Sequence, residues 1–210
     1  MAFYMSTIKY HNFLLSNRLM GCCVALFLIA IAPTIFAETP SATMLAYTCA
    51  GCHGTNGSSV GPASPTIAGM SSDYFIETML AYKNATRPST IMTRIAKGYS
   101  DEEIKLMADF FSSQPIIRQV QEYDSKQARR GRKLHKKYCN KCHEESGALA
   151  EDDAGILAGQ WSPFLRFTLT DFLTGNRVMG EKKKQQLDKL IKQQGEAGME
   201  QLIQFYASQQ

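Results

Sequence analysis

Two short stretches of the sequence combine thiols with an imidazole at fixed spacing. The first, YTCAGCHGTNG, occupies residues 47–57, and the second, YCNKCHEESG, begins at Tyr138. In each stretch two cysteines enclose two other residues and a histidine follows directly. The six side chains are Cys49, Cys52, His53, Cys139, Cys142 and His143. Such a cluster can form a redox disulfide, bind zinc or attach a haem covalently.

Covalent haem attachment accounts for every residue of both motifs. A redox disulfide leaves the histidines unexplained, and zinc ribbons place their cysteine pairs about 15–20 residues apart, far closer than these two motifs. In a CxxCH motif each thiol binds one porphyrin vinyl group, and the histidine becomes the proximal iron ligand. The sequence therefore predicts two covalently bound haem c groups, with His53 and His143 as axial ligands to iron.

A second ligand is needed on the other face of each iron, and methionine is the candidate. His135 lies one helical turn before Cys139, on the proximal side, so we expect it at the surface. In the second half of the chain, Met199 falls on the apolar face of an expected helix, whereas Met179 lies in the loop TGNRVMG. We therefore expect Met179 to bind the second iron.

The first half of the chain offers several methionines: Met70, Met79, Met92 and Met107. Met79 and Met107 lie in helical patterns, where methionine usually packs. When the two halves are aligned, Met70 falls opposite Gln160, but Met92 falls opposite Met179 once a three-residue insertion is allowed. The expected ligand pairs are His53 with Met92 and His143 with Met179.

The chain is an internal duplication. The segment IAGMSSDYFIETMLAYKNATR, from Ile67, aligns with LAGQWSPFLRFTLTDFLTGNR, from Leu157, at the offset that relates His53 to His143. The segment from Ser100 likewise aligns with the one from Gly195. Self-similarity of this kind indicates repeated structural units. We expect two tandem domains, residues 38–115 and 131–210, joined by a linker over 116–130.

Helical patterns dominate both repeats, so we expect an all-α protein with two cytochrome c domains. Ser100 and Glu103 form a capping-box pattern. Behind it, apolar residues recur at helical spacing, and the second repeat shows the same pattern; the two sets are Ile104, Met107, Ala108 and Phe111, then Met199, Leu202, Ile203 and Tyr206.

Three further residues or pairs are expected near the haems. The Pro62 carbonyl is preferred over that of Pro65 as the acceptor for the second ring nitrogen of His53. Asp152 or Asp153 occupies the corresponding loop of the second repeat. Trp161 is expected to pack in a haem pocket rather than to form a specific electron route.

The N-terminus has the features of an export signal. Lys9 and Arg18 precede an apolar run that ends at Ala37, which makes residues 1–37 a signal peptide. An uncleaved membrane anchor is the alternative. Removal of the signal lowers the formal net charge from +4 to about +2, which gives no indication of nucleic-acid binding. The protein is expected in the periplasm.

The stretch CAGCHGTNGSSVGPASPTIAGMSSDYFIETM resembles the dihaem cytochrome subunit of flavocytochrome c sulfide dehydrogenases. The second half, with CNKCHEESG and GNRVMG, is similar to the same subunits and to the related dihaem cytochrome c4 family. The resemblance implies two His/Met-ligated haems that face each other and a periplasmic location. It also implies a complex with an FAD-containing flavoprotein that oxidises sulfide.

Two functions of different class follow. In the first, this chain accepts electrons from the FAD of a flavoprotein subunit and passes them to a downstream cytochrome or oxidase. In the second, it is a free dihaem carrier between respiratory complexes and a terminal oxidase. No GxGxxG pattern follows a strand pattern, so FAD is expected on the partner chain alone. A peroxidase needs one open iron, which the two methionines disfavour.

Overall fold

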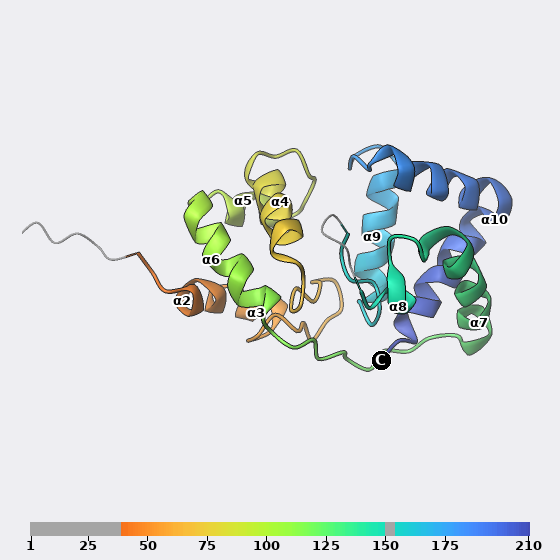
Figure 1. Cartoon of the computed structure of the whole chain (residues 1–210), viewed down its shortest axis with the longest axis horizontal. Coiled ribbons are helices and arrows are strands. Elements are labelled where there is room, and N and C mark those ends of the chain that lie inside the picture. The colour runs from red at the N-terminus through yellow and green to blue at the C-terminus, as the bar shows by residue number, and fades with distance from the viewer. Residues whose placement is uncertain (1–38, 150–153) are drawn as a thin grey trace, which may run out of the picture. The chain divides into compact units, whose positions relative to one another are not determined.

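The computed structural model describes residues 39–149 and 154–210. The expected signal peptide, Asp152 and Asp153 lie outside the described residues. Every regular element among the described residues is a helix (Figure 1), which confirms the all-α expectation. Residues Pro40–Gln210 form one compact unit. Within the described part of the chain, no helix has both the length and the apolar character required to span a bilayer.

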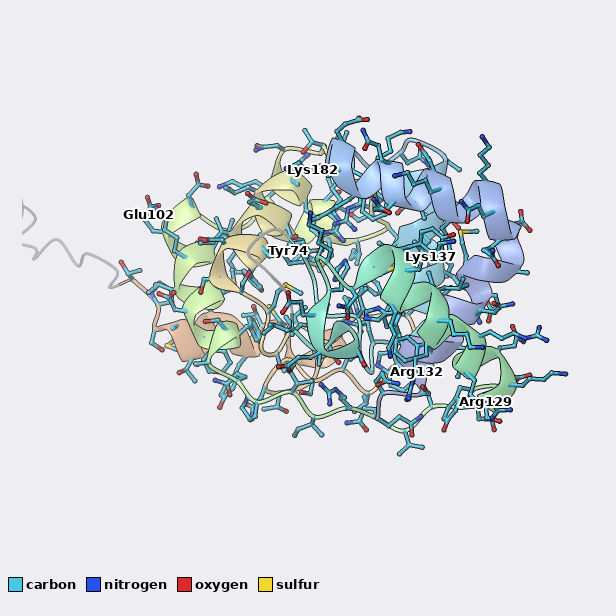
Figure 2. All side chains as sticks on the ribbon, turned by 45° about the vertical axis from the view of Figure 1, so that its right-hand side comes forward. Tyr74, Glu102, Arg129, Arg132, Lys137 and Lys182 are labelled. Atoms are coloured by element: carbon cyan, nitrogen blue, oxygen red, sulfur yellow. The ribbon has the colours of Figure 1, made fainter. Side chains whose placement is uncertain are left out.

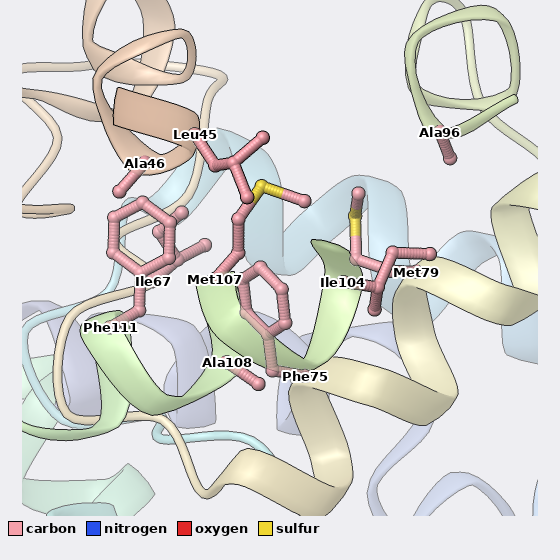
Figure 3. Close-up of a cluster of buried hydrophobic side chains, with 10 residues drawn as sticks. All are labelled: Leu45, Ala46, Ile67, Phe75, Met79, Ala96, Ile104, Met107, Ala108 and Phe111. Atoms are coloured by element: carbon pink, nitrogen blue, oxygen red, sulfur yellow. The ribbon is translucent and has the colours of Figure 1, made fainter. Parts of the chain in front are cut away.

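The first repeat contains α2 (Ala42–Tyr47), α3 (Ala50–His53), α4 (Ser72–Lys83), α5 (Met92–Ala96) and α6 (Asp101–Ser112). The α6 helix begins with the expected capping box: Glu103 N–H donates to Ser100 Oγ at 3.1 Å, and Ser100 N–H donates to Glu103 Oε2 at 2.7 Å. The predicted apolar face of α6 is buried against α2 and α4. Figure 3 shows this core, with Leu45 near Met107 and with Phe75 and Met79 beside Ile104.

The second repeat contains α7 (Ser125–Leu134), the π-helix η1 (His135–Cys139), α8 (Glu144–Gly147), α9 (Ser162–Leu173) and α10 (Glu181–Ala207). The α10 helix is interrupted at Gly195, where φ is 61°. Its C-terminal part supplies the buried residues Leu202, Ile203 and Tyr206, as the sequence pattern predicted, and Met199 is half-buried against them.

The α7 helix begins inside the range 116–130 that the sequence suggested as the linker, so residues 125–130 are helical. This helix packs on α10, and Gly131 allows the close approach. A Cβ atom at Gly131 would lie 1.9 Å from the Gln201 carbonyl oxygen, so a side chain there would force the two helices apart. The placement of α7 therefore depends on a residue without a side chain.

Backbone hydrogen bonds show the duplication directly. In the first repeat the Gly57 carbonyl accepts from Ile67 N–H at 2.7 Å and from Ala68 N–H at 3.0 Å. In the second repeat the Gly147 carbonyl accepts from the N–H groups of Leu157 at 2.9 Å and Ala158 at 3.0 Å. The loop after each CxxCH motif is thus folded back by the same pair of hydrogen bonds.

Candidate haem sites

The first CxxCH motif ends in a buried histidine with one ring nitrogen fixed. His53 closes the short helix α3, and its side chain is 8% exposed. Its Nδ1–H donates to the Pro65 carbonyl at 2.8 Å. Nε2 therefore carries the lone pair that can bind a metal. Burial lowers the pKa of His53, so the imidazole is held in the neutral form that binds metals.

The acceptor for His53 is Pro65, so the sequence-based choice of Pro62 was wrong. Pro62 is exposed. The two hydrogen bonds to the Gly57 carbonyl turn the chain at Ile67 back towards the motif, and this turn places the Pro65 carbonyl at the His53 ring. Both prolines lie in one loop, and only its three-dimensional path distinguishes them.

All four cysteines of the two motifs are free thiols. Burial raises the pKa of the Cys49 thiol, and it raises the pKa of Cys139 to about 11. These two thiols are therefore held in the protonated form at neutral pH. The buried neutral imidazole next to paired free thiols fits covalent haem. When bound, a haem c takes up and releases one electron at its iron.

The second motif begins within the π-helix η1, whose last residue is Cys139. His143 N–H donates to the Cys139 carbonyl at 3.0 Å, matching the 2.9 Å bond from His53 to Cys49. The motif backbones of the two repeats therefore have the same fold, although the elements that lead into them differ.

His135 is buried at 2% exposure, so the expectation of a surface position was wrong. Its Nε2–H donates to Asn140 Oδ1 at 3.2 Å, and its Nδ1 accepts from the Tyr206 hydroxyl at 3.1 Å. Its ring also contacts Phe205, with centroids 5.2 Å apart. The helical spacing of Ala128, Gly131, His135 and Tyr138, all buried, is the sequence signal that could have revealed this position.

The candidate methionines differ in burial and in the elements that carry them. Met92 begins α5 and packs, half-buried, against the same core cluster as Cys49. Met70 packs against that cluster too, so burial does not separate the two. Met179 is half-buried and lies two residues before α10. Met79 and Met107 are core residues, as their helical patterns indicated.

Two equivalent arginines meet between the repeats. The backbone N–H of Arg87 donates to Ala81 and that of Arg177 to Asp171, at 3.2 and 3.0 Å. The Arg177 guanidinium donates to the Tyr74 hydroxyl at 3.1 Å. Burial alone would raise the pKa of Tyr74, but the positive charges of Arg177 and Arg87 outweigh it and hold that pKa below its ordinary value. Arg87 is buried, and Tyr74 and Arg177 are half-buried; sequence reasoning did not identify this cluster.

Trp161 contacts the first repeat. Its Nε1–H donates to the Ser59 carbonyl at 3.1 Å, and its ring lies so close to Gly61 that a Cβ atom there would be 2.9 Å from it. The neighbouring Gln160 is 5% exposed and also bonds across the repeats, to Thr66. The pair forms a polar contact between the two halves.

Comparison with known proteins identifies the family. The cytochrome c family profile matches residues 39–115. Cytochrome c4 of Pseudomonas aeruginosa is 30% identical over 139 residues, which cover 62% of this chain and 68% of that protein. The chain belongs to the cytochrome c4 family. It is therefore an electron-transfer protein with two covalently bound haem c groups.

A second relative is a subunit of an enzyme complex. The cytochrome subunit of sulfide dehydrogenase from Chlorobaculum tepidum is 46% identical over 70 residues, which cover 33% of this chain. The match spans 63% of that subunit's length. Among solved structures, reduced cytochrome c4 from Pseudomonas stutzeri aligns over 80% of this chain and 97% of its own, with a TM-score of 0.69 and 24% identity. That likeness supports the fold of two cytochrome c domains.

Proposed function

We propose that this cytochrome is the electron-accepting subunit of a periplasmic sulfide dehydrogenase. A separate flavoprotein chain would oxidise sulfide at FAD, and this chain would carry single electrons from one haem to the other and on to a downstream cytochrome or oxidase. The observation that carries the proposal is the 46% identity with a sulfide dehydrogenase cytochrome subunit, which exceeds the 30% identity with cytochrome c4.

The proposed attachment residues are Cys49 and Cys52 for the first haem, and Cys139 and Cys142 for the second. The proposed axial pairs are His53 with Met92 and His143 with Met179. The neutral, fixed imidazole of His53 supports the first pair. Met92 packs, half-buried, at the edge of the first core together with Cys49, and Met179 is half-buried two residues before α10. A bound group can therefore reach both thioethers.

The two repeats would have different partners. Residues 38–121 carry six Lys and Arg against seven Asp and Glu, whereas residues 122–210 carry fifteen against twelve. Figure 2 shows Arg129, Arg132 and Lys137 along α7 and η1 and Lys182 at the start of α10. The first repeat would form the lasting contact with the flavoprotein. The second, more basic repeat would meet an acidic acceptor briefly, through a small interface of the kind that weak redox pairs use.

Co-expression with the flavoprotein subunit of a sulfide dehydrogenase tests the proposal. The expected result is a stable complex that contains flavin and reduces both haems when sulfide is added. Exchange of Lys182, Lys183 and Lys184 for glutamine should leave sulfide-dependent haem reduction unchanged and slow only the transfer to the downstream acceptor. Purification as a single chain that no flavoprotein reduces with sulfide would contradict the proposal.

The second candidate is a free dihaem carrier between respiratory complexes. The match with cytochrome c4 over 62% of the chain favours it, since that match extends beyond one repeat. The same co-expression experiment separates the two functions, because a free carrier would purify without flavin and would accept electrons directly from a respiratory complex.

A further inference from the structure

A side chain of the second repeat bonds to the peptide group next to the first haem motif's histidine. Gln160 lies two residues before α9 and is 5% exposed. Its Oε1 accepts from Thr66 N–H at 2.9 Å, and its Nε2 donates to the Thr66 carbonyl at 3.0 Å. The amide thus bonds the Thr66 backbone as a neighbouring strand would.

The Thr66 N–H and the Pro65 carbonyl belong to one peptide group, which is a planar conjugated unit. The Pro65 carbonyl accepts from His53 Nδ1–H at 2.8 Å. A continuous line of hydrogen bonds therefore runs from Gln160 through a single peptide group to His53. When its N–H donates to Gln160, the peptide carbonyl becomes more negative and a stronger acceptor, an effect of about 10–30% per bond in such chains.

We propose that Gln160 is a positioning residue that sets the reduction potential of the first-repeat haem from the second repeat. It fixes the Pro65–Thr66 peptide group and polarises its carbonyl. A stronger acceptor at Nδ1 makes the imidazole a more basic ligand at Nε2, which favours ferric iron and lowers the potential. The inference rests on the proposed axial role of His53.

Among the residues that the structure describes, this double hydrogen bond runs from the second repeat to the first. The residue equivalent to Gln160 in the first repeat is Met70, whose thioether has no hydrogen to donate and is a weak acceptor. A methionine cannot bond a backbone N–H and carbonyl together as the Gln160 amide does. The two repeats thus differ at this position despite their common origin, and only the first would have a haem ligand coupled to an amide of the other repeat.

Other bonds between the repeats provide a matched control. The Arg177 guanidinium of the second repeat donates to the Tyr74 hydroxyl of the first at 3.1 Å, a bond of similar length. Tyr74→Phe removes that bond and keeps the aromatic ring, the Gln160 side chain and the Pro65–Thr66 peptide group. If Gln160 served the contact between repeats alone, the two changes would have equivalent effects on the haems.

The test is a spectroelectrochemical titration of the purified dihaem protein with chemical mediators. Gln160→Met should raise the first-repeat haem's potential and leave the other unchanged. We expect a two- to tenfold change in the equilibrium constant for reduction, which is about 20–60 mV at 59 mV per tenfold for one electron. Gln160→Asn, which is shorter by one methylene and cannot reach both Thr66 groups, should shift the same haem if Gln160→Met fails to fold. The His53 Nδ1 proton should also exchange faster with solvent in both variants.

Equal shifts of both potentials, no shift, or the same shift in Tyr74→Phe would overturn the proposal. The titration uses neither sulfide nor a flavoprotein, so its outcome is independent of which complex the chain joins. His53→Ala tests the axial role of His53, on which the proposal rests. An unchanged spectrum of the first-repeat haem in this variant would show that His53 is not the axial ligand.

Discussion

Two buried histidines, His53 and His135, are held as neutral rings by different partners. His53 uses one nitrogen for Pro65 and keeps the other for a ligand. His135 uses both nitrogens, one towards Asn140 and one towards Tyr206, so it has no lone pair left for iron. Burial lowers the pKa of both rings, and the hydrogen-bond partners decide which ring can bind a metal.

The first prediction concerns the methionine ligands. Met92→Leu should remove the weak sulfur-to-iron charge-transfer band of one ferric haem, and Met179→Leu should remove that of the other, so each variant loses about half of the band. Met70→Leu is the matched control and should retain the full absorbance. The ferric absorption spectrum is the measurement. Loss of the band in Met70→Leu but not in Met92→Leu would refute the first assignment.

The second prediction is a dependence of stability on pH that arises from His135. Its pKa in the folded protein is below the ordinary 6.5 because of burial, so the unfolded chain binds the proton more readily. The contribution to stability is complete above about pH 6.5 and is lost as pH falls below it, by at most about 1.4 kcal/mol per pH unit.

His135→Gln keeps polar groups at the site but cannot titrate. The free energy of unfolding, measured by denaturant titration at several pH values, should therefore fall less steeply below pH 6.5 in His135→Gln than in the unmodified protein. Parallel curves would show that other groups cause the acid sensitivity.

At the scale of helices, the α7–α10 contact depends on Gly131, which gives the third prediction. A methyl group at Gly131 would overlap the Gln201 backbone and contact Phe205 Cβ at 2.8 Å. Gly131→Ala should lower the free energy of unfolding by about 1–3 kcal/mol, the usual cost of overpacking. Arg130→Ala is the control, since Arg130 is an exposed residue of the same helix; its effect should be within about 0.5 kcal/mol. Thermal unfolding of the haem-loaded protein measures both, and equal losses would contradict the contact.

Helices, repeats and haem motifs could be predicted because they depend on local patterns. The capping box of Ser100 and the buried face from Ile104 to Phe111 follow from spacing along one helix. The Pro65 acceptor could not be chosen over Pro62, because it depends on bonds from the loop to Gly57. The Gln160–Thr66 contact joins residues 94 positions apart, a pairing that no local pattern specifies.

At the scale of the whole molecule, the charge is distributed unevenly along a chain whose halves share one fold. Among the basic residues near the start of α10, Lys184 pairs with Asp188 at 2.7 Å, and Lys182 is exposed. On α7, exposed cations such as Arg129 and Arg132 line the helix. Charges grouped on one repeat can steer an oppositely charged partner to that repeat, so that electrons leave the protein from the haem of that repeat. Charges spread evenly over both repeats would favour neither haem as the electron donor to the partner.

The last prediction follows from this asymmetry. Electron transfer from the reduced protein to an acidic acceptor should slow as salt increases, because the Debye length shortens from about 30 Å at 0.01 M to about 10 Å at 0.1 M ionic strength. Exchange of Lys182, Lys183 and Lys184 for glutamine should lower the rate at low salt and flatten its salt dependence. Exchange of Lys83, Lys97 and Lys105 in the first repeat removes the same charge and is the matched control. Stopped-flow mixing with the acceptor measures the transfer rate of both triple variants. If the rates of the two variants respond equally to salt, net charge governs the encounter, and the acceptor does not prefer the second repeat.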